Sequence, residues 1–309
     1  MKRVDQLIDR VRSWTENNDV STTAGIQDQD FVDALSDGQD MLEGAVYRNV
    51  PYCSWFDFAT TYTLVAAEES VDLPFDCYYR DGVRKVEFSK DADAEFYYPL
   101  EPENFLQRSV TQASYPSSYS ISGGRIYLSP PPSISGGTLR VTYARKLPTL
   151  ADTVGVVSAF STNITLTNDT FLDATTLSAA VPGYFSLIRR LDGAIISKNL
   201  TATAYDIATR VLTVSVAPTY ETGFSSADVV SAFLVPGKGA TNIPAWPQGT
   251  DAVERYLRNY AIWKIFRRES STDTSEQGNE LSAIEADIVQ AANAAQGDYG
   301  VIDFKSCDW

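Results

Sequence analysis

Histidine is missing from the 309 residues, and cysteine occurs only three times. The absence of histidine excludes Ser-His-Asp and Cys-His nucleophiles, HExxH metal sites and imidazole general bases. Cys53, Cys77 and Cys307 are far apart and form no CxxC pair, so the sequence predicts free thiols and neither a disulfide framework nor a zinc site. Catalysis by carboxylates, lysine or a cofactor does not require histidine and so is not excluded, but no motif in the sequence supports it.

Long hydrophobic runs and an excess of positive charge are absent too. No stretch approaches the roughly 18 apolar residues that span a bilayer, and residues 1–14 lack the apolar core of a secretory signal. We therefore expect a soluble chain that is made in the cytoplasm and contacts no membrane. The net charge of −15 is the opposite of the basic surface that grips phosphates. A negatively charged channel surface would let DNA pass without binding, because like charges repel each other. Acidity also simply keeps a folded protein soluble.

Apolar spacing predicts helices towards both ends of the chain. Between residues 4 and 14, apolar side chains recur every three or four positions, as on the buried face of a helix. The same pattern predicts a helix over residues 28–49, weakened in its middle by Gly38, and helices over 250–268 and 275–295. Each apolar stripe needs a partner surface, so we expect these helices to pack on one another or on a neighbouring subunit.

Strand-forming residues fill the middle of the chain. Residues 58–145 predict an antiparallel meander, curled into a barrel or a sandwich, with a hairpin turn at Gly123-Gly124. Residues 151–244 are rich in Thr, Ser, Ala and Val and poor in charge. Between turn residues, strands are expected over residues 162–167, 184–189, 194–197, 211–217 and 229–235. This second segment predicts a compact all-β insertion.

The elements together predict an α+β fold, in which N- and C-terminal helices pack with an antiparallel β-barrel or sandwich that carries an inserted all-β domain. We expect four parts along the chain. Helices and meander occupy residues 1–150, the inserted domain 151–244, the completing helices 245–296, and an extended tail 297–309.

Sequence motifs for chemistry are weak throughout. The acidic run from Asp91 to Glu95 lacks the glycine and the bidentate glutamate of an EF-hand, so a solvated loop is the better interpretation. Gly123-Gly124 and Gly136-Gly137 open no helix and precede no Lys-Ser or Lys-Thr, so they are hairpin turns and not phosphate loops. We assign no catalytic, cofactor-binding or metal-binding residue.

Three segments in order resemble a known family. Two N-terminal helices are followed by FATTYTLVAAEESVDLPFD, then by YSISGGRIYLSPPPSISGGTLRVTYARKLPTL, and finally by IPAWPQGTDAVERYLRNYAIWKIFRRE. The features shared are the turn at Leu73-Pro74, the proline-ended hairpin over 126–132 and the helix introduced by Pro247. Over residues 1–150 and 244–309 the chain resembles the head-to-tail adaptor proteins of tailed bacteriophages, also called connectors or tail tubular protein A-like proteins.

This resemblance implies a structural virion protein and not an enzyme. It implies a homo-oligomeric ring, dodecameric in the family, that is assembled in the host cytoplasm and sits in the neck or tail of the virion. The expected partners are the portal protein, the tail tube, nozzle or other tail proteins, and the double-stranded DNA that passes without sequence-specific contact. Such adaptors send their C-terminal tail into the portal, and by position Ile302, Phe304 and Trp309 are the expected docking anchors.

Two other functions stay open at this point. The chain could be a tail or baseplate module whose insertion recognises another virion protein or a glycan of the host surface. An enzyme built on Asp91, Asp93 and Glu95 is the remaining and weakest alternative.

Overall fold

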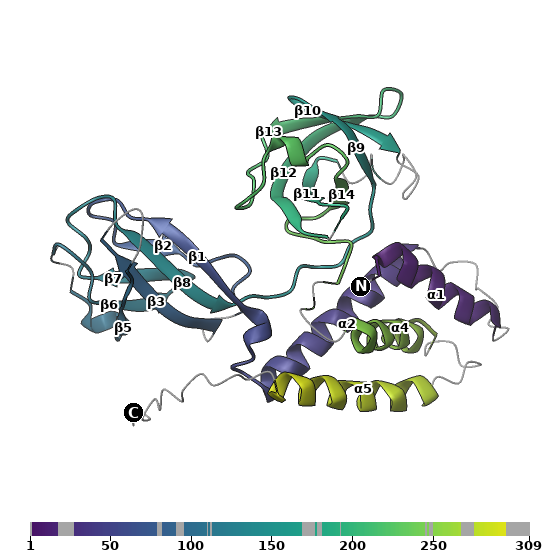
Figure 1. Ribbon diagram of the computed structural model, residues 1–309, viewed down its shortest axis with the longest axis horizontal. Helices are drawn as coiled ribbons and strands as arrows, with labels where there is room; N and C mark the ends of the chain where they lie inside the picture. Colours follow the sequence, from purple (N-terminus) through teal and green to yellow (C-terminus); the bar gives the residue numbers. More distant parts are fainter. Residues whose placement is uncertain are drawn as a thin grey trace. The chain divides into compact units, whose positions relative to one another are not determined.

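The chain folds into helices and three β-sheets, drawn in Figure 1. The computed structural model describes residues 2–17, 28–78, 82–90, 96–109, 111, 113–168, 177, 181–191, 193–244, 246, 250–266 and 275–294. These residues divide into two compact units. The bundle-barrel unit comprises the described residues up to 51 and from 148 to 294, and the sandwich unit comprises those from 52 to 147.

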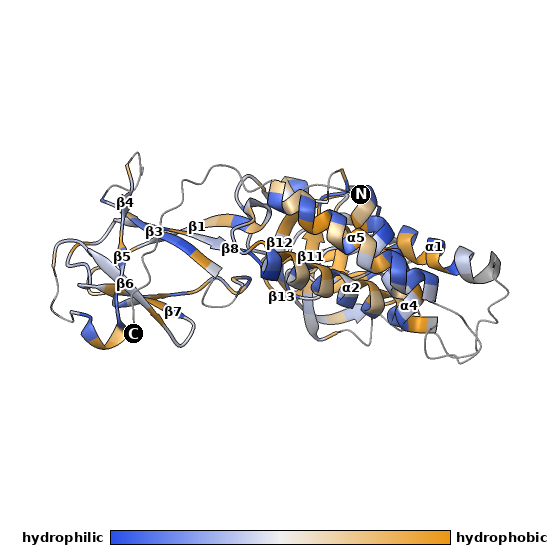
Figure 2. Cartoon of the chain, turned by 90° about the horizontal axis from the view of Figure 1, so that it is seen from below, coloured by the Kyte–Doolittle hydropathy of each residue, from blue (hydrophilic) through white to orange (hydrophobic). Residues whose placement is uncertain are grey.

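Four helices form a bundle: α1 (Val4–Asn17), α2 (Asp28–Asn49), α4 (Thr250–Phe266) and α5 (Ser275–Ala294). Helix α4 packs against each of the other three, and accordingly carries buried residues on more than one side, such as Val253, Leu257 and Ile262. Figure 2 shows hydrophobic and hydrophilic residues alternating along these helices, as expected when one face of each is buried. A Cβ atom at Gly38 would lie 2.9 Å from Cδ1 of Tyr260, so the glycine allows α2 to approach α4 closely.

The sandwich unit contains eight strands among its described residues: β1 (Asp57–Thr63), β2 (Ser70–Asp72), β3 (Val83–Ser89), β4 (Tyr98–Pro99), β5 (Glu101–Pro102), β6 (Ser118–Ser122), β7 (Arg125–Ser129) and β8 (Thr138–Ala144). They form two sheets, in the orders β1-β8-β3-β4 and β2-β7-β6-β5. Val86 and Val141 of the first sheet share one hydrophobic core with Val71 and Ile126 of the second. The two sheets therefore form a sandwich.

The strand order of the sandwich differs from the simple meander that the sequence predicts. The last strand, β8, lies between β1 and β3, and β5 pairs with β6 in parallel. Five of the seven residues of β8 are buried, among them Leu139, Val141 and Tyr143. A strand with so little exposed surface is best placed in the middle of a sheet, which explains its insertion between two earlier strands.

The segment 151–244 forms a closed barrel in the strand order β10-β13-β12-β11-β14-β9. Its strands are β9 (Gly155–Phe160), β10 (Asn163–Asn168), β11 (Gly183–Ile188), β12 (Ile195–Asp206), β13 (Val211–Val216) and β14 (Phe233–Pro236). Every pair is antiparallel, and the pairing of β9 with β10 closes the sheet. Phe185, Leu200, Leu212 and Leu234 are among the side chains that fill the interior.

The α+β class predicted from the sequence is confirmed, as are the four helices and the all-β character of the insertion. The strand β9 was missed, and β12 extends much further than the strand expected at residues 194–197. The four-part domain division stays a prediction. Within the described part of the chain, no helix is both long and apolar enough to cross a membrane.

Candidate functional site

Helices α1 and α4 enclose a basic groove of about 260 Å³. We define the basic groove by its lining residues Lys2, Leu7, Arg10, Asp251, Glu254, Arg255 and Arg258. Leu7 and Arg10 are three positions apart on α1. On α4 the lining positions 251, 254, 255 and 258 follow the helical period, so each helix presents one side to the groove.

Two of the four cations in the basic groove are neutralised within the chain. The buried carboxylate of Glu254 accepts hydrogen bonds from the backbone N–H of Lys2 at 2.6 Å and from its Nζ at 3.1 Å. Arg255 forms an ion pair with Glu280 of α5, and this contact lowers the pKa of Glu280. The other two cations, Arg10 and Arg258, form no ion pair with any described carboxylate. The groove is therefore suited to an anionic group.

Helix α2 carries an acidic stripe, which we define as Asp30, Asp33, Asp37 and Asp40. These residues follow one another at spacings of three and four, so they share one face of the helix, and all four are exposed. Asp37 forms an ion pair with Lys264 of α4, and Asp33 accepts a hydrogen bond from the side chain of Gln29 at 2.8 Å. The bundle thus has a basic groove on two helices and an acidic stripe on a third.

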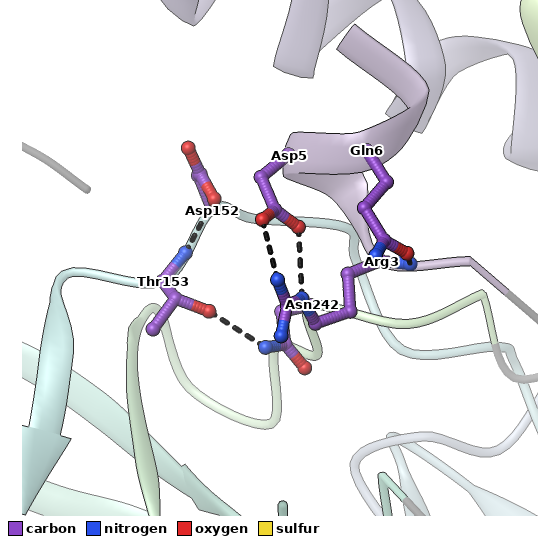
Figure 3. A network of polar contacts seen from close by, with 6 residues as sticks. All are labelled: Arg3, Asp5, Gln6, Asp152, Thr153 and Asn242. Carbon is purple, nitrogen blue, oxygen red and sulfur yellow. Dashed lines mark hydrogen bonds and ion pairs between the residues drawn. The ribbon is translucent and has the colours of Figure 1, made fainter. Parts of the chain in front are cut away.

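A polar joint links the helical bundle to the barrel (Figure 3). The chain leads into the barrel beside the segment by which it leaves, because Leu150 and Thr241 form a parallel bridge. The carbonyl of Asn242 accepts a hydrogen bond of 2.9 Å from the N–H of Val4, one of the donors that the first turn of α1 cannot satisfy itself. The side chain of Asn242 donates to Oγ1 of Thr153 at 2.6 Å, and so ties the start of α1 to the first residues of the barrel.

Asp152 lies in this joint with a strongly altered acidity. Burial raises its pKa to about 6, a hydrogen bond from the backbone N–H of Thr153 opposes that rise, and the negative charge of Asp5 adds to it. Arg3 acts in the opposite direction, but its guanidinium is already held by Asp5 through two hydrogen bonds of 3.0 and 2.8 Å. The Arg3 guanidinium also lies over the ring of Phe233 in the barrel, 5.4 Å from its centroid. The folded protein therefore disfavours the charged form of Asp152, which lies where the bundle joins the barrel.

Within the described residues, no group of three or more Cys, Asp or Glu side chains is arranged to hold a metal ion. Cys53 and Cys77 are free thiols, as the sequence predicts, and Cys307 lies outside the described residues. Burial raises the pKa of Cys77 to about 11, which keeps this thiol protonated at neutral pH.

The residues predicted to dock into the portal, Ile302, Phe304 and Trp309, lie outside the described residues, as does the acidic run 91–95. Gly123 and Gly124 form the predicted hairpin turn between β6 and β7, and both have positive φ angles. Sequence reasoning missed the basic groove, because Lys2 and Arg10 are more than 240 positions away from Arg255 and Arg258. The one local signal in the sequence was the pair Arg255 and Arg258, three positions apart on a predicted helix of a strongly acidic chain.

Comparison with known proteins adds the family. A family model described as SU10 adaptor protein matches residues 2–184. The chain belongs to this family. The match covers α1, α2, the sandwich unit and the first strands of the barrel of the adaptor, whereas α4 and α5 lie beyond it. No curated protein matches the adaptor sequence.

Membership identifies the chain as a phage adaptor protein, a structural component of the virion that interacts with other virion proteins. It confirms the family predicted from the sequence. The adaptor family is one of structural proteins and not of enzymes.

Proposed function

We propose that this adaptor forms the homo-oligomeric ring that joins the portal to the tail and lines the DNA passage. The observation that carries the proposal is the presence, on one helical bundle of an adaptor-family protein, of a basic groove and of an acidic stripe on another helix. Two arginines of the groove form no ion pair with a described carboxylate. The ring works by assembly, with no catalytic centre and no cofactor.

A ring requires each subunit to present two different surfaces that fit one another, since head-to-tail contacts are heterologous. In the ring we propose, the acidic stripe on α2 of one copy faces the basic groove of the next. Charge complementarity of this kind sets the register of an interface and disfavours wrong partners more than it adds affinity. Arg10 and Arg258, which form no ion pair with a described carboxylate of their own chain, would then face the aspartates of the stripe.

The passage of DNA is supported by the distribution of charge. Helix α5 carries Glu276, Glu280, Glu285 and Asp287 and has no lysine or arginine. Glu276 and Asp287 are exposed, whereas Glu280 is held by Arg255 of α4, and the other exposed residues of α5 are uncharged. A wall of α5 helices would therefore repel phosphates. We place α5 at the channel for this reason.

Docking to the portal is assigned to the C-terminal tail, with Ile302, Phe304 and Trp309 as apolar anchors. Aromatic side chains contribute most at the centres of interfaces, which favours Phe304 and Trp309 over the neighbouring polar residues. A chain that ends at residue 296 is expected to fold normally and to be lost from the virion neck. Normal neck occupancy by this truncated chain would contradict the assignment.

A charge exchange tests the ring interface. Arg10→Glu and Asp33→Arg are each expected to lower the amount of adaptor in purified virions at least about tenfold, because each places like charges opposite one another. The two substitutions combined in one chain are expected to restore incorporation. Arg190→Glu on the barrel, an exposed arginine outside the groove, is the matched control and is expected to assemble normally.

Imaging of the particle decides the location. A cryo-electron microscopy map is expected to show the adaptor as a closed ring between portal and tail, at ring stoichiometry. A map that places the chain elsewhere in the particle would overturn the proposal. A free protein that stays monomeric is compatible with it, because subunits of this kind can assemble on the portal as a template.

A second candidate function concerns the barrel alone. Leu191 is 89% exposed on the barrel, and Tyr184 and Val216, which both pair with Thr201 in the sheet, are more than half exposed. These residues favour contact of the barrel with another virion protein or a host surface, as in a tail or baseplate module. Binding of glycan arrays or host cells by intact adaptor, lost in Leu191→Ser, would support this candidate.

A further inference from the structure

The outer strands of the sandwich unit differ in how well they are protected from pairing with another chain. Strands β4 and β5 have two residues each and contain Pro99 and Pro102, which have no N–H to donate. Strand β2 has three residues, ends at Asp72 and follows Glu68-Glu69. Short length, proline and charge are the usual means by which proteins block unwanted strand pairing.

Strand β1 lacks these protections after its first residue, Asp57. It is seven residues long and pairs with β8 on one side. Phe58 to Thr63 reads Phe-Ala-Thr-Thr-Tyr-Thr, without charge, proline or glycine. β-Branched and aromatic residues of this kind are the ones that favour extended structure. From Phe58 onward, strand β1 is therefore a long, uncharged edge, whereas the other sheet edges in the described part of this unit are blocked.

The hydrogen-bond register shows which backbone groups of β1 are open. The N–H of Arg145 donates to the carbonyl of Phe56 at 2.7 Å, and the N–H of Leu64 donates to the carbonyl of Gly137 at 2.8 Å. These two bonds fix the phase of the antiparallel ladder, in which alternate residues of a strand face the partner. Even-numbered residues of β1 therefore bond to β8, and the N–H and C=O groups of the odd-numbered ones point away from it.

Ala59, Thr61 and Thr63 together present three backbone donors and three acceptors on this open side, since each residue carries one of each. Their side chains are exposed, and no other described residue hydrogen-bonds to their backbone groups. The edge is ordered in advance of any binding. Tyr62 donates its hydroxyl to the carbonyl of Asp72 at 2.9 Å, and the ring of Phe58 packs edge-on against that of Tyr143.

We infer that β1 is a docking edge for an extended segment of another virion protein, which joins the sheet as an added strand. Main-chain hydrogen bonds would supply the affinity of such strand addition, and alternate side chains its specificity. The segment fits best if it is uncharged and rich in β-branched or hydroxyl residues, because it would lie beside Ala59, Thr61 and Thr63.

A second copy of the chain is the wrong occupant, an argument that rests on the proposed ring. The barrel is closed and has no edge, and the other sandwich edges, β2, β4 and β5, are blocked. Among the described residues β1 could then pair with β1 of another copy, but that contact is two-fold symmetric and cannot propagate head to tail. Since no described strand of a second copy fits, we assign the strand to a different protein of the particle.

Hydrogen exchange on the full-length adaptor tests the inference. In the free protein the amides of Ala59, Thr61 and Thr63 are expected to exchange rapidly, and in purified virions about 100-fold more slowly, since each gains a partner. Equal exchange in both states, with the adaptor present in the neck, would overturn the docking edge and leave the proposed ring intact. Absence of the adaptor from the neck would instead overturn the ring.

Two variants provide a second readout. Thr61→Pro removes an outward N–H without breaking a bond to β8, and Thr61→Lys keeps the backbone and adds a charge that disfavours strand addition. Both are expected to fold, to form rings, and to lose the slow exchange at Ala59 and Thr63 in particles. Thr61→Val, which keeps the edge intact, is the control and is expected to behave as the natural chain. A free protein that dimerises through β1, and becomes monomeric as Thr61→Lys, would assign the edge to a second copy and overturn the inference.

Discussion

Replacing Asp152 by asparagine is expected to stabilise the bundle-barrel unit at neutral pH. Burial raises the pKa of Asp152 from its usual value of 3.8 to about 6, so the folded state disfavours the charged carboxylate. Two pKa units correspond to about 3 kcal/mol. Partial access of solvent to the side chain reduces this to about 1.5 kcal/mol. Asparagine removes the charge and keeps the oxygen that accepts the N–H of Thr153 at 2.7 Å.

The sign of the effect depends on pH. Because the pKa is higher in the folded state, protonated Asp152 contributes stability that is complete below pH 3.8 and is lost as the pH rises through about 6. Asp152→Asn should therefore be more stable than the natural chain by about 1.5 kcal/mol at pH 7.5. The difference should shrink below pH 6 and disappear near pH 4.

Urea unfolding followed by tryptophan fluorescence measures this difference. Trp55→Phe and Trp309→Phe in the background leave Trp14, Trp246 and Trp263, which belong to the bundle-barrel unit. Free energies of unfolding are compared at pH 7.5, 6, 5 and 4.

The control substitution is the same chemical change at a carboxylate with the opposite shift. Hydrogen bonds from the hydroxyl of Thr209 and the N–H of Ala208 lower the pKa of the exposed Asp206, so Asp206→Asn should not stabilise the protein at any pH. An Asp152→Asn variant that is no more stable than the natural chain at pH 7.5, or whose advantage does not depend on pH, would refute the reasoning.

Two further substitutions separate competing effects. Gly38→Ala should destabilise the bundle by about 1–3 kcal/mol in urea unfolding, because a Cβ would lie 2.9 Å from the Tyr260 ring and this overpacking outweighs the gain of about 1 kcal/mol in helix propensity; a stabilised variant would show that the helices separate freely. Burial alone would raise the pKa of Glu87, but hydrogen bonds from Lys85 and Arg140 outweigh it and lower the pKa. Glu87→Gln should therefore destabilise the sandwich unit by about 1–2 kcal/mol at pH 7, with the loss fading as acid protonates Glu87 in the natural chain; thermal unfolding at pH 7 and pH 3 that gives equal losses would contradict this.

The helices were predictable because their signal is local. Val4, Leu7, Ile8 and Val11 are all buried, and their spacing of three and four residues follows directly from the helical period. The barrel strands were harder to predict. Residues 197–204 of β12 are mostly small or polar, so they resemble a loop until the other strands of a closed sheet surround them.

Features that depend on distant parts of the chain could not be predicted from periodicity. The central place of β8 follows from competition among strands for the middle of a sheet, which no single segment reveals. The basic groove brings Lys2 beside Glu254, 252 positions away. The open side of β1 is likewise defined by which strands pair elsewhere, although the sequence correctly indicated a strand there. The anchors assigned to the tail, Ile302, Phe304 and Trp309, stay a prediction.

The bridge between Leu150 and Thr241 makes the whole barrel equivalent to a tight turn in the chain that runs from β8 to α4. The chain enters the barrel beside the point where it leaves it on the way to α4, so the size of the barrel does not change the distance between residues 150 and 241. Lengthening a closed loop also costs little entropy once its ends are fixed. Shortening or replacement of the barrel is therefore expected to leave the helical bundle intact.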